Sequence, residues 1–194
     1  MRVLKNANYN YDANNVSEIN GYTKWYDWNV VKKHTRVINI IITTILIILA
    51  FSFRQSLRNT LDMTSFILVL IGGILFWLVI ITPIHEILHL IPLSKGILDN
   101  KCIITVGQGV VSAIYNGYIN LYQQLISLVL PFTVFLVFFG FGAIFTTGVI
   151  KIIFLYLLIL SSFGSYTDIY MFFYSMKHIG KNDIVFGLYK KESR

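Results

Sequence analysis

The chain has 194 residues, of which 56% are hydrophobic and 13% are charged, and its formal net charge is +7. Soluble domains carry about 25% charged residues, so this composition excludes an ordinary soluble domain and indicates an integral membrane protein. In such a protein an excess of Lys and Arg indicates membrane topology and contact with the lipid surface, so we expect no nucleic-acid partner. The single cysteine, Cys102, excludes an internal disulfide.

In chain order, the first predicted element is a polar N-terminal segment, 1–36, which lacks the apolar core of a cleavable signal peptide. Four apolar segments follow, each long enough to cross a hydrocarbon core of about 30 Å, and they predict transmembrane helices over about 37–53, 63–90, 121–145 and 149–176. A basic tail, 179–194, comes last. We therefore expect an all-α membrane protein, with a bundle of four transmembrane helices in one domain over 37–178.

The loop between the second and third predicted helices is the only sizeable polar insertion. Two runs rich in β-branched residues, "CIITV" (102–106) and "VVSAIY" (110–115), are separated by "GQG". Such runs around a glycine-containing turn are typical of a β-hairpin. The sequence therefore predicts a short β-hairpin on the cytoplasmic side, between helices two and three.

The distribution of basic residues predicts the orientation. Thirteen of them fall in segments that a four-span topology places on one side of the membrane: Arg2, Lys5, Lys24, Lys32, Lys33, Arg36, Lys95, Lys101, Lys177, Lys181, Lys190, Lys191 and Arg194. Only Arg54, Arg58 and Lys151 fall on the other side. The positive-inside rule then places both termini in the cytoplasm of a multi-pass protein of the cell membrane.

The second and third predicted helices contain proline and glycine residues that affect their shape and packing. Pro83 and Pro131 are expected to kink the second and third helices, because proline lacks the N–H of a helical hydrogen bond. Four glycines within these helices are expected to mark close helix packing: Gly72, Gly73, Gly140 and Gly142.

The end of the second predicted helix carries ionisable residues where hydrocarbon is expected. The stretch "HEILH", 85–89, has the pattern H-E-x-x-H. On a helix, His85 and His89 face the same way and can reach one metal ion, and Glu86 lies beside them. Catalytic zinc uses three protein ligands and keeps one position for water, so a third ligand is needed.

Asp168 is the best candidate for that ligand, because it is the only acidic residue within the fourth predicted helix. His85 follows Met63 by roughly 33 Å of helix and Asp168 follows Val149 by roughly 28 Å, at about 1.5 Å per residue. The two helices run in the same direction under the predicted topology, so these residues lie at similar depth. Asp99, His178 and His34 are instead expected in loops or at the headgroups.

Other interpretations of these residues have to be weighed. Buried His and Glu also serve as hydrogen-bonding groups between membrane helices. Haem is disfavoured, because its axial ligands lie on opposite faces of the iron, whereas positions i and i+4 lie on one side. Imidazole and carboxylate ligands without a redox requirement favour one zinc ion over iron or copper.

With these residues in view, the chain resembles the zincin peptidases, small bacterial membrane proteins that are similar to the site-2 proteases, which are intramembrane zinc metalloproteases. "HEILH" (85–89), "GSYTDIY" (164–170) and "YINLYQQLISLVLPF" (118–132) carry the resemblance. It implies His85, His89 and Asp168 as zinc ligands and Glu86 as the catalytic base. Site-2 proteases usually have Asp-Gly at the third-ligand position, whereas Ile169 follows Asp168 here.

The expected function is that of a membrane-embedded zinc metalloprotease, in which Glu86 activates a zinc-bound water to hydrolyse a peptide bond in or next to the membrane. Its partners would be the lipid bilayer and a peptide or membrane-protein substrate. The alternative is a non-catalytic immunity or sensor protein that keeps the metal site. An ion transporter would need polar residues across the full depth of the helices. It is disfavoured, because the outer halves of the predicted helices, away from the cytoplasmic side, are almost entirely apolar.

Overall fold

The computed structural model describes residues 2–5, 22–24, 33–34, 36–37, 40–41, 44, 62–93, 101–107, 110–186 and 189–191. They belong to two compact units. The first unit combines Met1–Trp28, Pro83–Pro131 and Asp168–Arg194, and the second combines Asn29–Thr82 and Phe132–Thr167. The first predicted transmembrane helix, 37–53, lies outside the described residues except for isolated helical positions.

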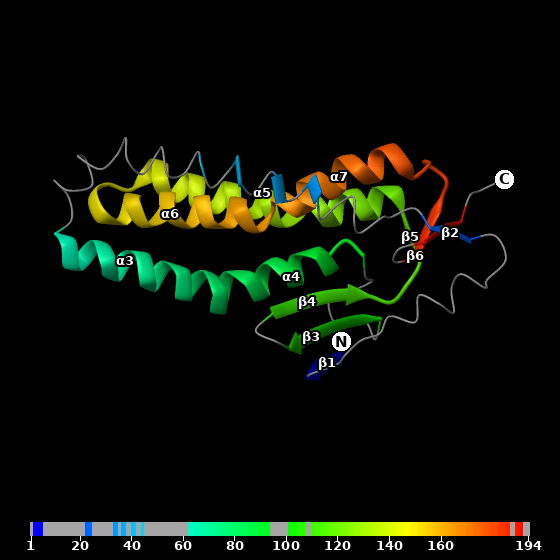
Figure 1. Ribbon diagram of the computed structural model, residues 1–194, viewed down its shortest axis with the longest axis horizontal. Helices are drawn as coiled ribbons and strands as arrows, with labels where there is room; N and C mark the ends of the chain where they lie inside the picture. Colours follow the sequence, from blue (N-terminus) through cyan, green and yellow to red (C-terminus); the bar gives the residue numbers. More distant parts are fainter. Residues whose placement is uncertain are drawn as a thin grey trace. The chain divides into compact units, whose positions relative to one another are not determined.

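The described helices lie where the sequence has its long apolar segments (Figure 1). Met63–Leu90 and Leu121–Phe145 are each long and apolar enough to cross a membrane. A third crossing follows if Gly148–Gly164 (α6) and Tyr166–His178 (α7) count as one bent span. The described residues thus contain two to three potential membrane helices, compared with the four that the sequence predicts for the whole chain.

The segment Met63–Leu90 has three parts: α3 (Met63–Phe76), the π-helical turn η1 (Trp77–Ile81) and α4 (Thr82–Leu90). The side chain of Asp62 caps α3 by accepting a hydrogen bond from the Ser65 amide. In η1 the Thr82 amide donates to the Trp77 carbonyl, five residues back, and the Thr82 hydroxyl contacts the same oxygen at 3.1 Å. The π turn thus ends two residues before Pro83, where the sequence predicts a kink.

Glycine allows close helix packing in the second unit. A Cβ atom at Gly73 would lie 2.5 Å from the ring of Tyr156, whose hydroxyl donates to the Leu70 carbonyl at 3.2 Å. The ring of Phe154 occupies the corresponding space at Gly142. At Gly72 and Gly140 an added Cβ would meet nothing within 4 Å among the described residues. Within the described residues, Gly73 and Gly142 are therefore confirmed as close packing positions.

The first unit contains a three-stranded sheet with strand order β1-β3-β4 (Figure 1). Strand β3 (Cys102–Gly107) pairs antiparallel with β4 (Val110–Tyr115), and β1 (Arg2–Lys5) adds parallel to β3. The predicted hairpin is confirmed, in the register that aligns Cys102 with Tyr115. Cys102 and Ile104 of β3 form a buried cluster with Leu90 at the end of α4, so the sheet packs on the helix that carries the histidines.

A second sheet in the same unit has the strand order β2-β7-β6-β5. Its strands are β2 (Tyr22–Lys24), β5 (Ile119–Asn120), β6 (Ile184–Phe186) and β7 (Tyr189–Lys191). The all-α expectation with a single hairpin was therefore incomplete. These strands have two or three residues each, too short for a local alternation of apolar and polar residues to identify them. Only β6 and β7 are neighbours in sequence, whereas β2 pairs with β7 and β5 with β6 across long stretches of sequence.

Candidate metal centre

Two histidines one helical turn apart form the centre of the site. His85 and His89 belong to α4, and the i, i+4 spacing brings their rings together at a centroid distance of 4.9 Å. Their Nε2 atoms lie 3.2 Å apart. The sequence prediction that both rings face the same region is therefore confirmed.

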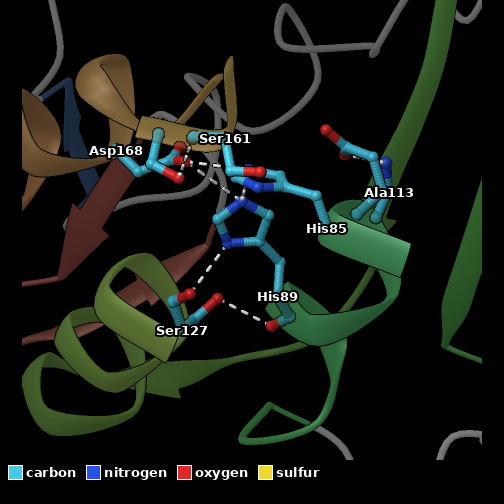
Figure 2. Close-up of polar contacts among 8 residues, drawn as sticks. His85, His89, Ala113, Ser127, Ser161 and Asp168 are labelled. Carbon is cyan, nitrogen blue, oxygen red and sulfur yellow. Dashed lines mark hydrogen bonds and ion pairs between the residues drawn. The ribbon is translucent and has the colours of Figure 1, made fainter. Parts of the chain in front are cut away.

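Asp168 reaches the same point from the first turn of α7. Its Oδ2 atom lies 3.0 Å from Nε2 of His85 and 3.5 Å from Nε2 of His89. Figure 2 shows the carboxylate of Asp168 turned toward the two imidazole rings. The comparison of helical depths placed Asp168 level with the histidines, and the structure brings the three side chains into contact.

The three residues make up a group that could hold a metal ion. Each offers one ligand atom, and these atoms lie within 4.8 Å of one another. The side chains of His85, His89 and Asp168 are only 11%, 15% and 16% exposed. Because solvent screening is weak in such a site, a carboxylate facing two nitrogen atoms strongly favours a bound cation or a proton.

Glu86 makes a different contact from its neighbours. Its Oε2 atom accepts a hydrogen bond of 2.8 Å from the amide of Ala113 in β4. In the strand order β1-β3-β4, β4 is the edge strand, so this amide is available to a partner other than β3. The carboxylate of Glu86 is thus held against the sheet edge, and the predicted hairpin contributes directly to the site.

Ser127 of α5 (Leu121–Phe145) is a residue of the site that the sequence analysis missed. Nδ1 of His89 lies 2.8 Å from the carbonyl oxygen of Ser127, and the hydroxyl of Ser127 donates to the His89 carbonyl at 2.7 Å. The ring of His89 consequently lies between Ser127 on one side and Asp168 on the other (Figure 2). Pro131, four residues after Ser127, could have indicated this role of Ser127, because a proline in a helix leaves the carbonyl four residues earlier without its usual hydrogen-bond donor.

The remaining candidates lie elsewhere or are not described. Nδ1 of His178 contacts the Tyr174 carbonyl one turn earlier at 2.9 Å, and its ring stacks on Tyr174. His34 is exposed, and Asp99 lies outside the described residues. Among the residues that the structure describes, His85, His89 and Asp168 form the one group with metal-binding geometry.

Comparisons of the chain with protein-family models, with curated proteins and with solved structures find no match.

Proposed function

We propose that the protein is a membrane-embedded zinc metalloprotease that hydrolyses a peptide bond in or next to the membrane. The observation that carries this proposal is the convergence of His85, His89 and Asp168, with Glu86 next to His85 in the same helix. Two to three apolar helices in the described residues support a membrane location. The resemblance of "HEILH" and "GSYTDIY" to the zincin peptidases and site-2 proteases points to the same activity.

The spacing of the ligand atoms suits zinc. A tetrahedral zinc ion with bonds of about 2.0–2.1 Å to nitrogen and oxygen separates its ligand atoms by about 3.3 Å. The three separations at the site are 3.0, 3.2 and 3.5 Å. Two imidazoles and one carboxylate also match the donor types of catalytic zinc sites, which keep a fourth position open.

Bound zinc would supply Lewis acidity, which polarises the scissile carbonyl and lowers the pKa of a coordinated water. Glu86 would act as the general base that takes a proton from water and delivers it to the leaving amine. For that role the carboxylate of Glu86 has to give up its hydrogen bond from the Ala113 amide and contact a water molecule instead. This exchange would take place by rotation about the torsions of the Glu86 side chain.

Strand β4 is suited to hold the substrate. A membrane helix has to unwind before its backbone can be cleaved, and an unwound segment can pair with the free edge of a sheet. The Ala113 amide on the edge of β4 contacts Glu86, so a peptide added along that edge would pass beside the proposed base. The hairpin would thereby both cover the site and position the substrate.

The decisive variant is Glu86→Gln, which keeps the shape of the side chain and removes its basicity. We expect peptide hydrolysis to fall on the order of 10²- to 10⁴-fold, while the zinc content of the purified protein stays unchanged. The measurement uses a panel of single-span reporter proteins in vesicles that contain the purified protein. His178→Ala serves as a matched control, because His178 contacts Tyr174 within α7. Cleavage by Glu86→Gln at the wild-type rate sinks the protease proposal.

The contact between Glu86 and Ala113 also favours a second candidate, a non-catalytic immunity or sensor protein. In this case the Glu86 carboxylate keeps its hydrogen bond to β4 permanently and so holds α4 against the sheet. The metal then has a structural or sensing role. A cellular effect that survives Glu86→Gln but is lost in His85→Ala would identify this second function.

A further inference from the structure

Pro131 changes the hydrogen bonding of the helix next to the site. It lies inside α5 and is less than 2% exposed. In a regular α-helix the carbonyl of Ser127 would accept a hydrogen bond from the amide of residue 131. Proline has no N–H, so this carbonyl lacks its helical donor, and Ser127 is only 5% exposed to water. A buried carbonyl in this position requires another donor.

The donor is His89. Its Nδ1 atom lies 2.8 Å from the Ser127 carbonyl oxygen, which can only accept a hydrogen bond. Nδ1 therefore carries the proton, and in a neutral ring Nε2 carries the lone pair. That lone pair faces Nε2 of His85 at 3.2 Å and Oδ2 of Asp168 at 3.5 Å, the other two candidate ligand atoms.

A second hydrogen bond runs in the opposite direction between the same two residues. The Ser127 hydroxyl donates to the His89 carbonyl at 2.7 Å. In a regular α-helix the His89 carbonyl would accept from the amide of Leu93, but that amide donates to the Leu90 carbonyl instead, at 3.2 Å. Each of the two helices thus presents a carbonyl without its helical donor, at Ser127 because of Pro131 and at His89 because α4 ends, and the two residues donate to each other's carbonyl.

We propose that Pro131 and Ser127 are positioning residues that select the tautomer of His89. By withholding an N–H from the Ser127 carbonyl, Pro131 makes that carbonyl the acceptor for Nδ1–H of His89. Nε2 is then presented as a lone pair toward His85 and Asp168. Hydrogen bonding of the second ring nitrogen commonly fixes a metal-binding histidine in this way. The inference rests on the proposed metal site but is independent of protease activity.

The sharpest test compares two residues that differ only by an N–H. Pro131→Ala introduces an amide that can donate to the Ser127 carbonyl and draw it back along the helix axis. Lactic acid, incorporated at position 131 as an ester, has the side chain of alanine but no N–H. We expect Pro131→Ala to weaken zinc binding about 10- to 100-fold, and the lactic acid variant to bind like the wild type. Chelator competition on the full chain in detergent measures both affinities.

Three outcomes of this comparison are informative. A loss with alanine that lactic acid does not share supports the proposal. Equal affinity of both variants and the wild type overturns it. An equal loss in both variants also overturns it, because the cause would then be the packing of the proline ring.

The tautomer itself provides a readout that needs neither metal nor substrate. The chain has four histidines, so ¹⁵N-histidine labelling of the metal-free protein gives few signals, and His89→Ala assigns one of them. We expect the neutral ring of His89 to carry its proton on Nδ1 in the wild type and in Ser127→Ala, which keeps the carbonyl. A proton on Nε2 in the wild type overturns the proposal even if Pro131→Ala fails to fold. A wild-type chain with the Nδ1–H tautomer that binds no zinc supports the selection of the tautomer and overturns the metal site.

Discussion

The two ends of the segment Met63–Leu90 are built for different surroundings. In α3 no residue is buried, and its side chains are apolar apart from Thr64 and Ser65 in the first turn. In α4, within nine residues, His85 and Leu90 are buried and three ionisable side chains appear. An apolar surface exposed along a whole helix suits lipid, whereas buried polar groups require partners. The apolar, lipid-facing pattern and the candidate metal ligands therefore occupy separate parts of one helical segment.

Replacing a candidate ligand, either on α4 or at its contact on α7, should have the largest effect. We expect His85→Ala, and separately Asp168→Ala, to reduce the zinc content from about one ion per chain to background, because two protein ligands hold zinc poorly. Elemental analysis of the purified protein measures this, with His178→Ala as the control. If Asp168→Ala keeps its zinc, Asp168 is not a ligand, and another residue completes the site.

A substitution in α3 should affect stability and leave zinc content unchanged. The Cβ of Gly73→Ala would meet the ring of Tyr156, whose hydroxyl is tied to Leu70. We expect a loss of about 1–3 kcal/mol in the free energy of unfolding. Gly72→Ala is the matched control, because its Cβ meets nothing within 4 Å in the described part of the chain and alanine favours a helix by about 0.5–1 kcal/mol. Denaturation of the detergent-solubilised protein compares the two, and equal stability of both variants would refute the packing argument.

The smallest effect is expected at the junction between the two ends. Thr82→Val removes the hydroxyl that contacts the Trp77 carbonyl at 3.1 Å in the π turn. One such bond contributes about 0.5–1.5 kcal/mol to stability, and the turn keeps its backbone bond from the Thr82 amide. We expect a small decrease in the unfolding midpoint with full zinc content. Loss of zinc in Thr82→Val would show that the two ends are not separable.

The sequence was sufficient for features that depend on local pattern. Apolar windows located the helices over 63–90 and 121–145, and β-branched runs around glycine located β3 and β4. The proximity of Asp168 to the histidines followed from helical rise and direction, which are regular enough to compare depths.

The missed features depend on pairing between distant segments. Nothing near Ala113 indicates that its amide would meet Glu86, and Ser127 is an ordinary helical serine until its carbonyl is considered together with Pro131. The second sheet was missed because its strands are too short to show a period and because β2 and β5 pair with segments far away in the sequence.

That second sheet has a mechanical consequence for the site. Strand β5 runs directly into α5, which carries Ser127, and β6 follows α7, which carries Asp168. The antiparallel pairing of Ile119 with Val185 and of Asn120 with Ile184 therefore acts as a spacer that sets the relative height of the two helices. A slip of one residue would displace one helix by about 3.3 Å, which is as large as the separations among the ligand atoms. Two backbone pairs that lie far from the histidines in the sequence thus help to align the side chains of the candidate metal centre.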